Sequence, residues 1–165
     1  MEQRFPCVGY DLAAIVPEAW KQEYIVPSFS QQTKDSIAAK MMKKILVIED
    51  EAQTRDIYLE CLEAEGFNAI GAENGRIGLQ RAQEQLPDLV ICDIMMPELD
   101  GYSVLTTLRQ NPITATIPVI FLTAKTTEAE RRYGIELGAD DYLNKPCTAE
   151  DLLRAIANVR ELTRR

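Results

Sequence analysis

Residues 89–101 read Leu-Val-Ile-Cys-Asp-Ile-Met-Met-Pro-Glu-Leu-Asp-Gly, and this stretch predicts both the fold and the centre of the chemistry. Four apolar residues, Leu89–Cys92, lead to one carboxylate, Asp93, and a proline and a glycine then turn the chain. A continuous apolar run of this length is typical of a strand buried on both faces of a parallel sheet. Ligands bind beyond the carboxyl ends of such strands, so Asp93 is a candidate functional residue. The alternative is an acid that only caps the next helix.

The composition limits the functions that the chain can have. It has 165 residues, 46% of them hydrophobic, which suffices for about one domain plus a tail. The net charge of −8 and the pI near 4.7 argue against a nucleic-acid-binding surface, which needs a basic patch. The sequence contains no histidine. A histidine base, a histidine metal ligand and a phosphohistidine are therefore excluded on this chain, and any such group must come from a partner.

Cysteine usage and hydropathy predict the compartment. No apolar run approaches the roughly 20 residues of a membrane span, and the N-terminus lacks the charged and then apolar pattern of a signal peptide. The four cysteines are widely spaced and form no metal-ligand pair. We therefore interpret them as reduced thiols and expect a cytoplasmic protein that binds no membrane.

Residues 1–41 differ from the rest of the chain. They contain three prolines, scattered aromatic residues and a polar stretch at 28–35, and no period of 2 or 3.6 persists there. We expect an N-terminal extension of unknown role that packs on the domain, stays mobile or is the remnant of something larger. A further interpretation is that the natural start is Met41 or Met42. The domain itself is expected over residues 42–165.

From residue 43 onward, strand and helix patterns alternate with short joints. This alternation is typical of a parallel sheet with crossover helices, and it predicts an α/β fold with a doubly wound five-stranded sheet flanked by five helices. The expected strands are 45–48, 67–71, 89–93, 119–122 and 141–143. The expected helices are 52–65, 75–86, 102–110, 127–138 and 148 almost to 165.

Polar residues follow four of these strands. Glu49 and Asp50 end the first strand, Asp93 the third and Thr123 the fourth, and Lys145 follows the fifth. Each has a simpler explanation as a helix cap or a solvated loop cation, and taken alone that explanation is favoured. Parallel strands, however, place all these ends along one rim. We therefore expect three acids, a hydroxyl and an ammonium to converge on one site.

This arrangement resembles the receiver domain of two-component response regulators, and in particular single-domain regulators of the chemotaxis-Y type. The resemblance covers about residues 43–165. It rests on Ile-Glu-Asp-Glu at 48–51, Asp-Ile-Met-Met-Pro at 93–97 with Asp-Gly at 100–101, Leu-Thr-Ala at 122–124, and Gly-Ala-Asp-Asp-Tyr-Leu-Asn-Lys-Pro at 138–146. It implies a flavodoxin-like fold with strand order 2-1-3-4-5.

The resemblance also implies roles for the acids. Asp93 would be the phosphoacceptor, and Asp50 and Asp93 would bind Mg²⁺, with Glu49 helping through water and the backbone carbonyl of Met95 as a further ligand. The residue types fit that role. Three crowded carboxylates repel one another, so the site requires a hard cation with oxygen ligands. An aspartate that attacks phosphorus gives an acyl phosphate by covalent catalysis.

Further residues are assigned by the same resemblance. Thr123 and Lys145 would hold the phosphoryl oxygens, Tyr142 would be the switch aromatic, and the Lys145–Pro146 peptide bond would be cis. A new phosphoryl group would draw Thr123 inward and let Tyr142 follow, which would alter the surface of the fourth helix, fifth strand and fifth helix. The alternative for Tyr142 is an ordinary half-buried strand aromatic.

The expected function is a phosphorylation-dependent signalling switch. The donor would be a histidine kinase or a histidine phosphotransfer protein, and the downstream protein target is unknown. The chain would not be an enzyme beyond catalysing its own phosphorylation and dephosphorylation. Two alternatives are a receiver-like interaction module that takes no phosphate and an aspartate-based phosphatase of the haloacid dehalogenase type. The phosphatase needs a second aspartate two residues after the first, and Met95 occupies that position.

Overall fold

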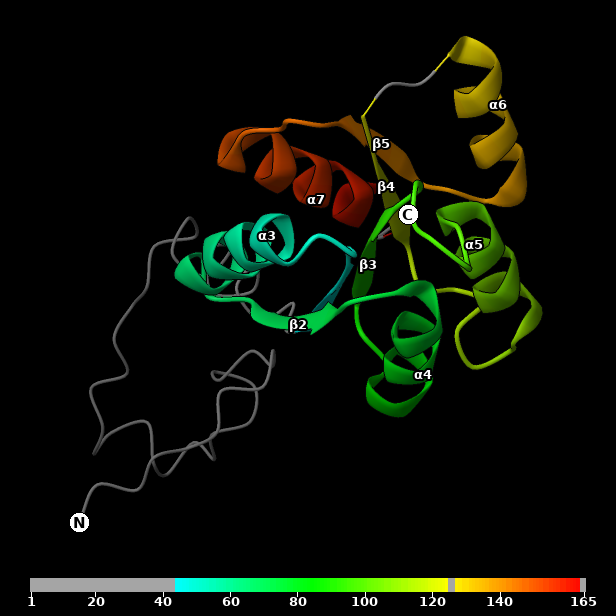
Figure 1. Cartoon of the computed structure of the whole chain (residues 1–165), viewed down its shortest axis with the longest axis horizontal. Coiled ribbons are helices and arrows are strands. Elements are labelled where there is room, and N and C mark those ends of the chain that lie inside the picture. The colour runs from blue at the N-terminus through cyan, green and yellow to red at the C-terminus, as the bar shows by residue number, and fades with distance from the viewer. Residues whose placement is uncertain (1–43, 125–126, 164–165) are drawn as a thin grey trace, which may run out of the picture. The chain divides into compact units, whose positions relative to one another are not determined.

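The computed structural model describes residues 44–124 and 127–163, with side chains as far as residue 159 (Figure 1). The expected N-terminal extension lies outside the described residues. Within them, no helix is long and apolar enough to cross a lipid bilayer.

The core of the fold is a five-stranded sheet in the order β2-β1-β3-β4-β5, and every pair of neighbouring strands is parallel. This confirms the expected fold class and strand order. The strands are β1 (Lys44–Ile48), β2 (Asn68–Ala72), β3 (Leu89–Asp93), β4 (Val119–Thr123) and β5 (Asp141–Asn144).

Four helices connect the strands and a fifth follows β5, and their labels follow Figure 1. They are α3 (Ala52–Ala64), α4 (Gly75–Gln85), α5 (Gly101–Gln110), α6 (Glu128–Leu137) and α7 (Ala149–Thr163). In Figure 1, α3 and α7 lie on one side of the sheet and α4 and α5 lie on the other. The bounds differ from the sequence-based expectation by one or two residues at several ends.

Both faces of the sheet are buried, because each central strand carries apolar residues at consecutive positions. Alternate side chains of β1, β3 and β4 point to opposite faces. One set packs with α4, α5 and the end of α6, and the other packs with α3 and α7. All five residues of β3 and all five of β4 are buried. The continuous apolar run in β3 is thus explained by two helical layers rather than one.

The expected helix caps are present. Asp100 accepts a hydrogen bond from the backbone N–H of Ser103 at 2.8 Å, which fixes the start of α5. Thr127 and Glu130 form a reciprocal capping box at the start of α6, as their spacing predicts. That helix ends at Gly138, whose φ of +103° is the left-handed conformation that glycine adopts without strain.

Arg109, at the end of α5, ties together three segments that the sequence keeps apart. Its guanidinium donates to the carbonyls of Ile117 and Gly138, both at 2.7 Å, and to that of Ala115 at 3.1 Å. It also contacts the carboxylate of Asp140 at 3.3 Å. Burial lowers the pKa of Arg109, although Asp140 opposes that shift. This side chain therefore joins α5 to the entry of β4 and to the turn before β5.

We predict that Arg109→Ala lowers the free energy of unfolding by about 2–3 kcal/mol, since three carbonyls lose a charged donor. Chemical denaturation measures this change. The matched control is Arg132→Ala on α6, because Arg132 makes an exposed ion pair at 3.9 Å with Glu128. That change should alter stability by less than about 0.5 kcal/mol. Equal effects at the two positions would contradict the structural role of Arg109.

A second prediction concerns the domain boundary. β1 begins at Lys44, whose backbone N–H donates to the side chain of Asp88 at 3.0 Å, so the start of the sheet is hydrogen-bonded within the domain. A chain that begins at Met42 should therefore unfold cooperatively, with a melting temperature close to that of the full chain. Circular dichroism melts of the two chains test this. Loss of cooperative unfolding on truncation would show that the earlier residues belong to the core.

Candidate functional site at the carboxyl rim of the sheet

Parallel pairing brings the polar strand ends to one rim. Ile48 pairs with Cys92, so Glu49 follows β1 at the level where Asp93 ends β3. Asp93 pairs with Leu122, and Thr123 pairs with Asn144, the residue before Lys145. The side chains that the sequence places at these ends are therefore neighbours.

Three carboxylates form the acidic part of this rim. Oxygens of Glu49, Asp50 and Asp93 lie within 4.8 Å of one another. Glu49 is 1% exposed and Asp93 is 3% exposed, whereas Asp50 is exposed to solvent. The group is therefore open on the side of Asp50 and closed by the protein on the side of Glu49.

Lys145 supplies the positive charge of the site. Its ammonium lies 3.1 Å from the carboxylate of Asp93 and donates a short hydrogen bond to that of Glu49. Its backbone N–H donates to the carbonyl of Thr123 at 2.7 Å, and the peptide bond to Pro146 is cis. The lysine thus bridges the two buried carboxylates from the end of β5.

The electrostatics follow from burial and pairing. Burial raises the pKa of Glu49, and Asp93 adds to this, whereas Lys145 and the backbone N–H of Glu51 oppose it. Burial alone would lower the pKa of Lys145, but its hydrogen bonds to Glu49 and Asp93 outweigh that effect, and the pKa is raised. The ammonium is therefore held in its charged form beside the two acids.

The loop after β3 holds Asp93 in place. The backbone N–H of Met95 donates to one carboxylate oxygen of Asp93 at 3.3 Å, and the Met95 side chain is 75% exposed. Gly101 packs against this loop so closely that a Cβ there would lie 2.6 Å from the carbonyl oxygen of Asp93. Its backbone N–H donates to the carbonyl of Ile94 at 2.9 Å. A glycine is thus needed where α5 starts beside the acidic residue.

The donor set suits a hard divalent cation. The three side chains offer only carboxylate oxygens, which are the ligands that Mg²⁺ and Ca²⁺ take in proteins. Among the described residues, no histidine or cysteine belongs to the group. An exposed member, Asp50, leaves room for retained water, which Mg²⁺ keeps when it binds. The residues therefore fit Mg²⁺.

Thr123 and Tyr142 lie on the adjacent strands β4 and β5. Thr123 is buried at the end of β4. Tyr142 is 8% exposed, and both of its interpretations, switch aromatic and ordinary strand aromatic, stay predictions. Its ring lies 5.4 Å from that of Phe121, measured between centroids.

Two contacts of the site were missed by sequence reasoning. Arg55 on α3 donates to the backbone carbonyl of Glu49 at 2.8 Å, which helps to fix the loop after β1. Tyr58, one turn further, is buried, and its hydroxyl lies 3.6 Å from the thiol of Cys147. Burial first, and this thiol second, raise the pKa of Tyr58. The apolar pattern of α3 marks Tyr58 as core, but nothing in the sequence marks Arg55.

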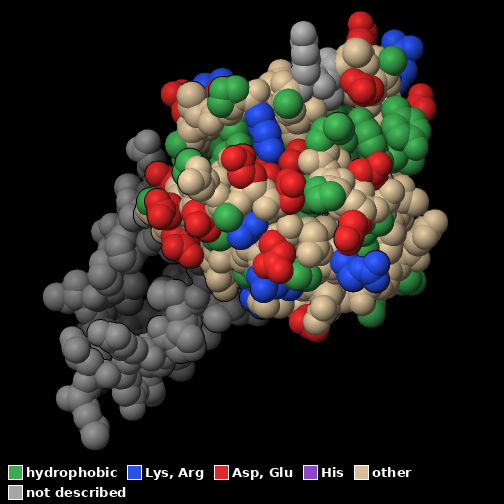
Figure 2. All heavy atoms as spheres, in the orientation of Figure 1, with side chains coloured by type: hydrophobic (Ala, Val, Ile, Leu, Met, Phe, Trp, Pro, Cys, Tyr) green, Lys and Arg blue, Asp and Glu red, His purple; other side chains and the backbone are tan. Residues whose placement is uncertain are grey.

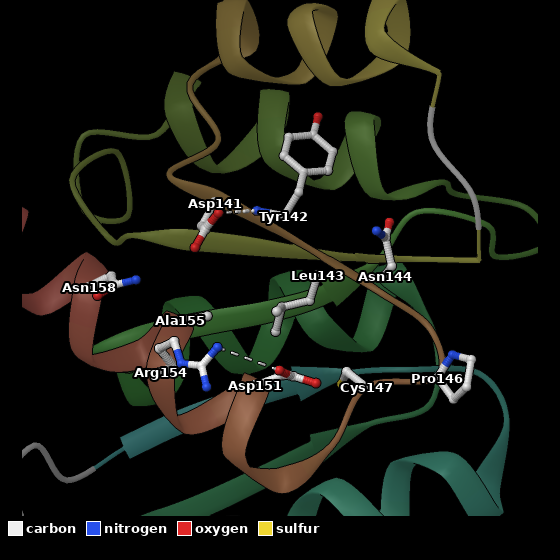
Figure 3. Close-up of a pocket in the computed structure, with 10 residues that line it drawn as sticks. All are labelled: Asp141, Tyr142, Leu143, Asn144, Pro146, Cys147, Asp151, Arg154, Ala155 and Asn158. Carbon is white, nitrogen blue, oxygen red and sulfur yellow. Dashed lines mark hydrogen bonds and ion pairs between the residues drawn. The ribbon is translucent and has the colours of Figure 1, made fainter.

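A shallow hollow lies between β5 and α7, and Figure 3 shows ten residues that line it. None of them is one of the three carboxylates. An ion pair of Arg154 with Asp151 crosses its edge at 3.9 Å. The acidic rim, rather than this hollow, therefore carries the candidate chemistry.

Comparison with known proteins agrees with this geometry. The family model of the response regulator receiver domain matches residues 45–157. The regulatory protein PhoP for alkaline phosphatase synthesis, from Bacillus subtilis, is 39% identical over 125 residues, which are 76% of this chain and 50% of PhoP. The transcriptional regulatory protein CpxR from Escherichia coli is 42% identical over 124 residues, covering 75% and 50%. The chain thus spans about half the length of the curated relatives it matches.

Solved structures give the same result. The chemotaxis protein CheY4 of Vibrio cholerae superimposes with a TM-score of 0.69 at 29% identity, covering 72% of this chain and 98% of that chain. The signal receiver domain of a histidine kinase from Syntrophus aciditrophicus gives 0.65 at 33% identity, covering 71% and 89%.

The fold, the acidic rim and these matches lead to one assignment. The chain belongs to the receiver domain family of two-component response regulators, whose members are regulators rather than classical enzymes.

Proposed function

We propose that the chain is a phosphorylation-dependent switch and that Asp93 accepts the phosphoryl group. The observation that carries this proposal is the position of Asp93 between the ammonium of Lys145, 3.1 Å away, and the exposed carboxylate of Asp50. Phosphoryl transfer depends mainly on positioning and on neutralising the charge of the phosphoryl oxygens, which Lys145 would do directly and Asp50 through the cation that it would bind.

In the proposed reaction, a carboxylate oxygen of Asp93 attacks the phosphorus of a phosphohistidine on a kinase or phosphotransfer protein. A bond forms between this oxygen and phosphorus, the phosphorus–nitrogen bond breaks, and the electron pair stays on the leaving imidazole. Lys145 and the hydroxyl of Thr123 contact the phosphoryl oxygens. A phosphohistidine donor lies outside these 165 residues, since they contain no histidine.

Mg²⁺ is the cation proposed for the acidic rim, where it would neutralise charge on the transferring oxygens. Asp50 and Asp93 would bind it directly, Glu49 would act through water, and the backbone carbonyl of Met95 would complete the protein ligands. The oxygen-only donor set supports this choice.

The proposed output is a change in the surface of α6, β5 and α7. A phosphoryl group on Asp93 would recruit the Thr123 hydroxyl at the end of β4, and Tyr142 on β5 would respond. The downstream target is a protein that recognises this surface, and we place the signalling in the cytoplasm. The match covers only 50% of each relative named as a transcriptional regulator, so their complete activities are not transferred to this chain.

The two alternatives lack comparable support. A phosphatase of the haloacid dehalogenase type would need an acid two residues after Asp93, and the thioether of Met95 there cannot move a proton. An interaction module that takes no phosphate would not need a buried pair of carboxylates bridged by a lysine. Burying such charges costs several kcal/mol per ion before pairing repays it, so a chemical role for them is favoured.

We predict that Mg²⁺ raises the melting temperature of the full chain. Binding at ten times the dissociation constant adds about 1.4 kcal/mol, which corresponds to several degrees for a domain of this size. Differential scanning fluorimetry with and without MgCl₂ measures the shift. Asp50→Ala should abolish it, while Glu63→Ala, which removes an exposed acid of α3, should leave it unchanged. No shift in excess Mg²⁺ would contradict the proposed cation site.

We also predict that acetyl phosphate with Mg²⁺ adds one phosphoryl group, detected by intact-mass spectrometry. An acyl phosphate is labile, so hydroxylamine should remove the added mass. Asp93→Asn should abolish labelling. The matched control is Asp100→Asn in the same loop, because asparagine caps a helix as well as aspartate does and α5 is preserved. Labelling that survives Asp93→Asn would refute the assignment of the acceptor.

A further inference from the structure

The ring of Tyr142 lies beneath α6. Figure 3 shows its side chain pointing from β5 toward that helix, while the neighbouring Leu143 points to the opposite side, toward α7. Phe121 packs against one part of the ring, and the guanidinium carbon of Arg131 lies 5.9 Å from its centroid. The hydroxyl reaches the backbone of α6 at the carbonyl of Glu130, 3.5 Å away. The ring is thus enclosed between the sheet and α6.

Gly134 provides the space for this ring. A Cβ at residue 134 would lie 1.4 Å from the Tyr142 hydroxyl oxygen and 2.7 Å from the adjacent ring carbon. Real Cβ atoms do not approach other atoms this closely, and an aromatic ring cannot bend away. Tyr102 would be the next neighbour at 3.3 Å, a tight contact that a small shift relieves. The buried position of Tyr142 and a side chain at residue 134 are therefore mutually exclusive.

The backbone does not require glycine at this position. Gly134 lies inside α6, and its φ is not positive, in contrast to Gly138, where a φ of +103° ends the helix. Glycine in a helix interior is unfavourable relative to alanine, because it loses more conformational freedom on folding. Gly134 thus destabilises α6 relative to alanine. The packing of the Tyr142 ring against Gly134 is a contact that compensates for this loss of stability.

We propose that Gly134 is the positioning residue of Tyr142, which admits the ring beneath α6 and so sets the balance between its buried and exposed positions. The consequence for signalling rests on the proposed function, in which Tyr142 transmits the state of Asp93 to the surface of α6 and β5. A larger residue at 134 would hold the ring outside and fix that surface in one form.

The surroundings explain why, in the proposed balance, the ring would have two distinct positions. Tyr102 packs edge-to-face on Phe121 at 5.4 Å and on Tyr133 at 5.2 Å, measured between ring centroids. Rigid aromatic rings therefore lie around the space that the Tyr142 ring fills beside Gly134, which we call the slot. Figure 2 shows apolar side chains gathered where α5 and α6 lie. Rigid rings do not close a slot gradually. A ring that leaves would therefore move outside α6 as a unit, and Tyr142 would become solvent-exposed.

The first test measures the exposure of Tyr142 directly, without phosphorylation. The full chain is labelled with 3-fluorotyrosine, and the resonance of Tyr142 is identified as the one missing in Tyr142→Phe. A soluble paramagnetic probe should leave this resonance largely unaffected in the parent chain and broaden it in Gly134→Ala. A resonance that stays shielded in Gly134→Ala would overturn the proposal. Labelling of Asp93 by acetyl phosphate is measured separately, so a failure of the proposed function is distinguishable from a failure of this inference.

The second test compares Gly134→Ala in three backgrounds by thermal melts. With Tyr142 present, the substitution should lower the melting temperature most. In Tyr142→Phe the closest atom is gone but the ring carbon at 2.7 Å remains, so the loss should be smaller. In Tyr142→Ala the slot is empty, and the alanine should leave the melting temperature unchanged or raise it, as expected from helix propensity.

This series remains decisive if Gly134→Ala alone does not fold. The proposal then requires that Gly134→Ala combined with Tyr142→Ala folds, because the ring is the cause of the conflict. An equal loss of melting temperature in all three backgrounds, or a double variant that does not fold when Tyr142→Ala does, would show that residue 134 conflicts with something other than the ring.

Discussion

Two buried carboxylates, Glu49 and Asp93, share one ammonium, that of Lys145, and the rest of the site depends on this arrangement. Without a positive partner, buried carboxylates would take up protons or destabilise the fold at the rim, because burial disfavours their charged forms. The pairing joins the ends of β1, β3 and β5, which come together only in the folded sheet, where β4 lies between β3 and β5. The reactive geometry is therefore a product of the whole sheet rather than of one loop.

The same lysine links the site to the surface. Its backbone N–H donates to the backbone carbonyl of Thr123 at the end of β4. Tyr142 lies three residues before Lys145, on β5. In the proposed function, a change in charge at Asp93 would thus act on Lys145, which directly follows the strand that carries the ring enclosed by α6. Packed strands and rings move between discrete arrangements rather than deforming continuously, which is what a switch requires.

Much of the fold was predictable from local patterns. The apolar runs of β1, β3 and β4, the cap at Asp100 and the capping box of α6 are signals that a few consecutive residues contain. The rim could be predicted as well, because parallel strands bring their ends together. The roles of Arg55, Arg109 and Gly134 could not, since each depends on how its helix packs against another segment, six residues away for Arg55 and Glu49 and 29 for Arg109 and Gly138. An arginine on a helix or a glycine within one has no local pattern that reveals its partner.

The three acids differ in exposure, and this difference explains how the Lys145 ammonium can fill two roles in the proposed reaction. Asp50 is accessible while Glu49 and Asp93 are closed in, so in the proposed reaction counter-charge enters at the Asp50 side. The carboxylates then depend less on Lys145 for neutralisation of their charge. The flexible four-carbon stem of Lys145 lets its ammonium turn from Glu49 toward the oxygens of a phosphoryl group on Asp93. Arginine, with its planar fork fixed on two partners, would make this exchange harder. In the proposed reaction, a lysine at the end of β5 is therefore suited both to pairing with the two buried carboxylates and to stabilising the phosphorylated site.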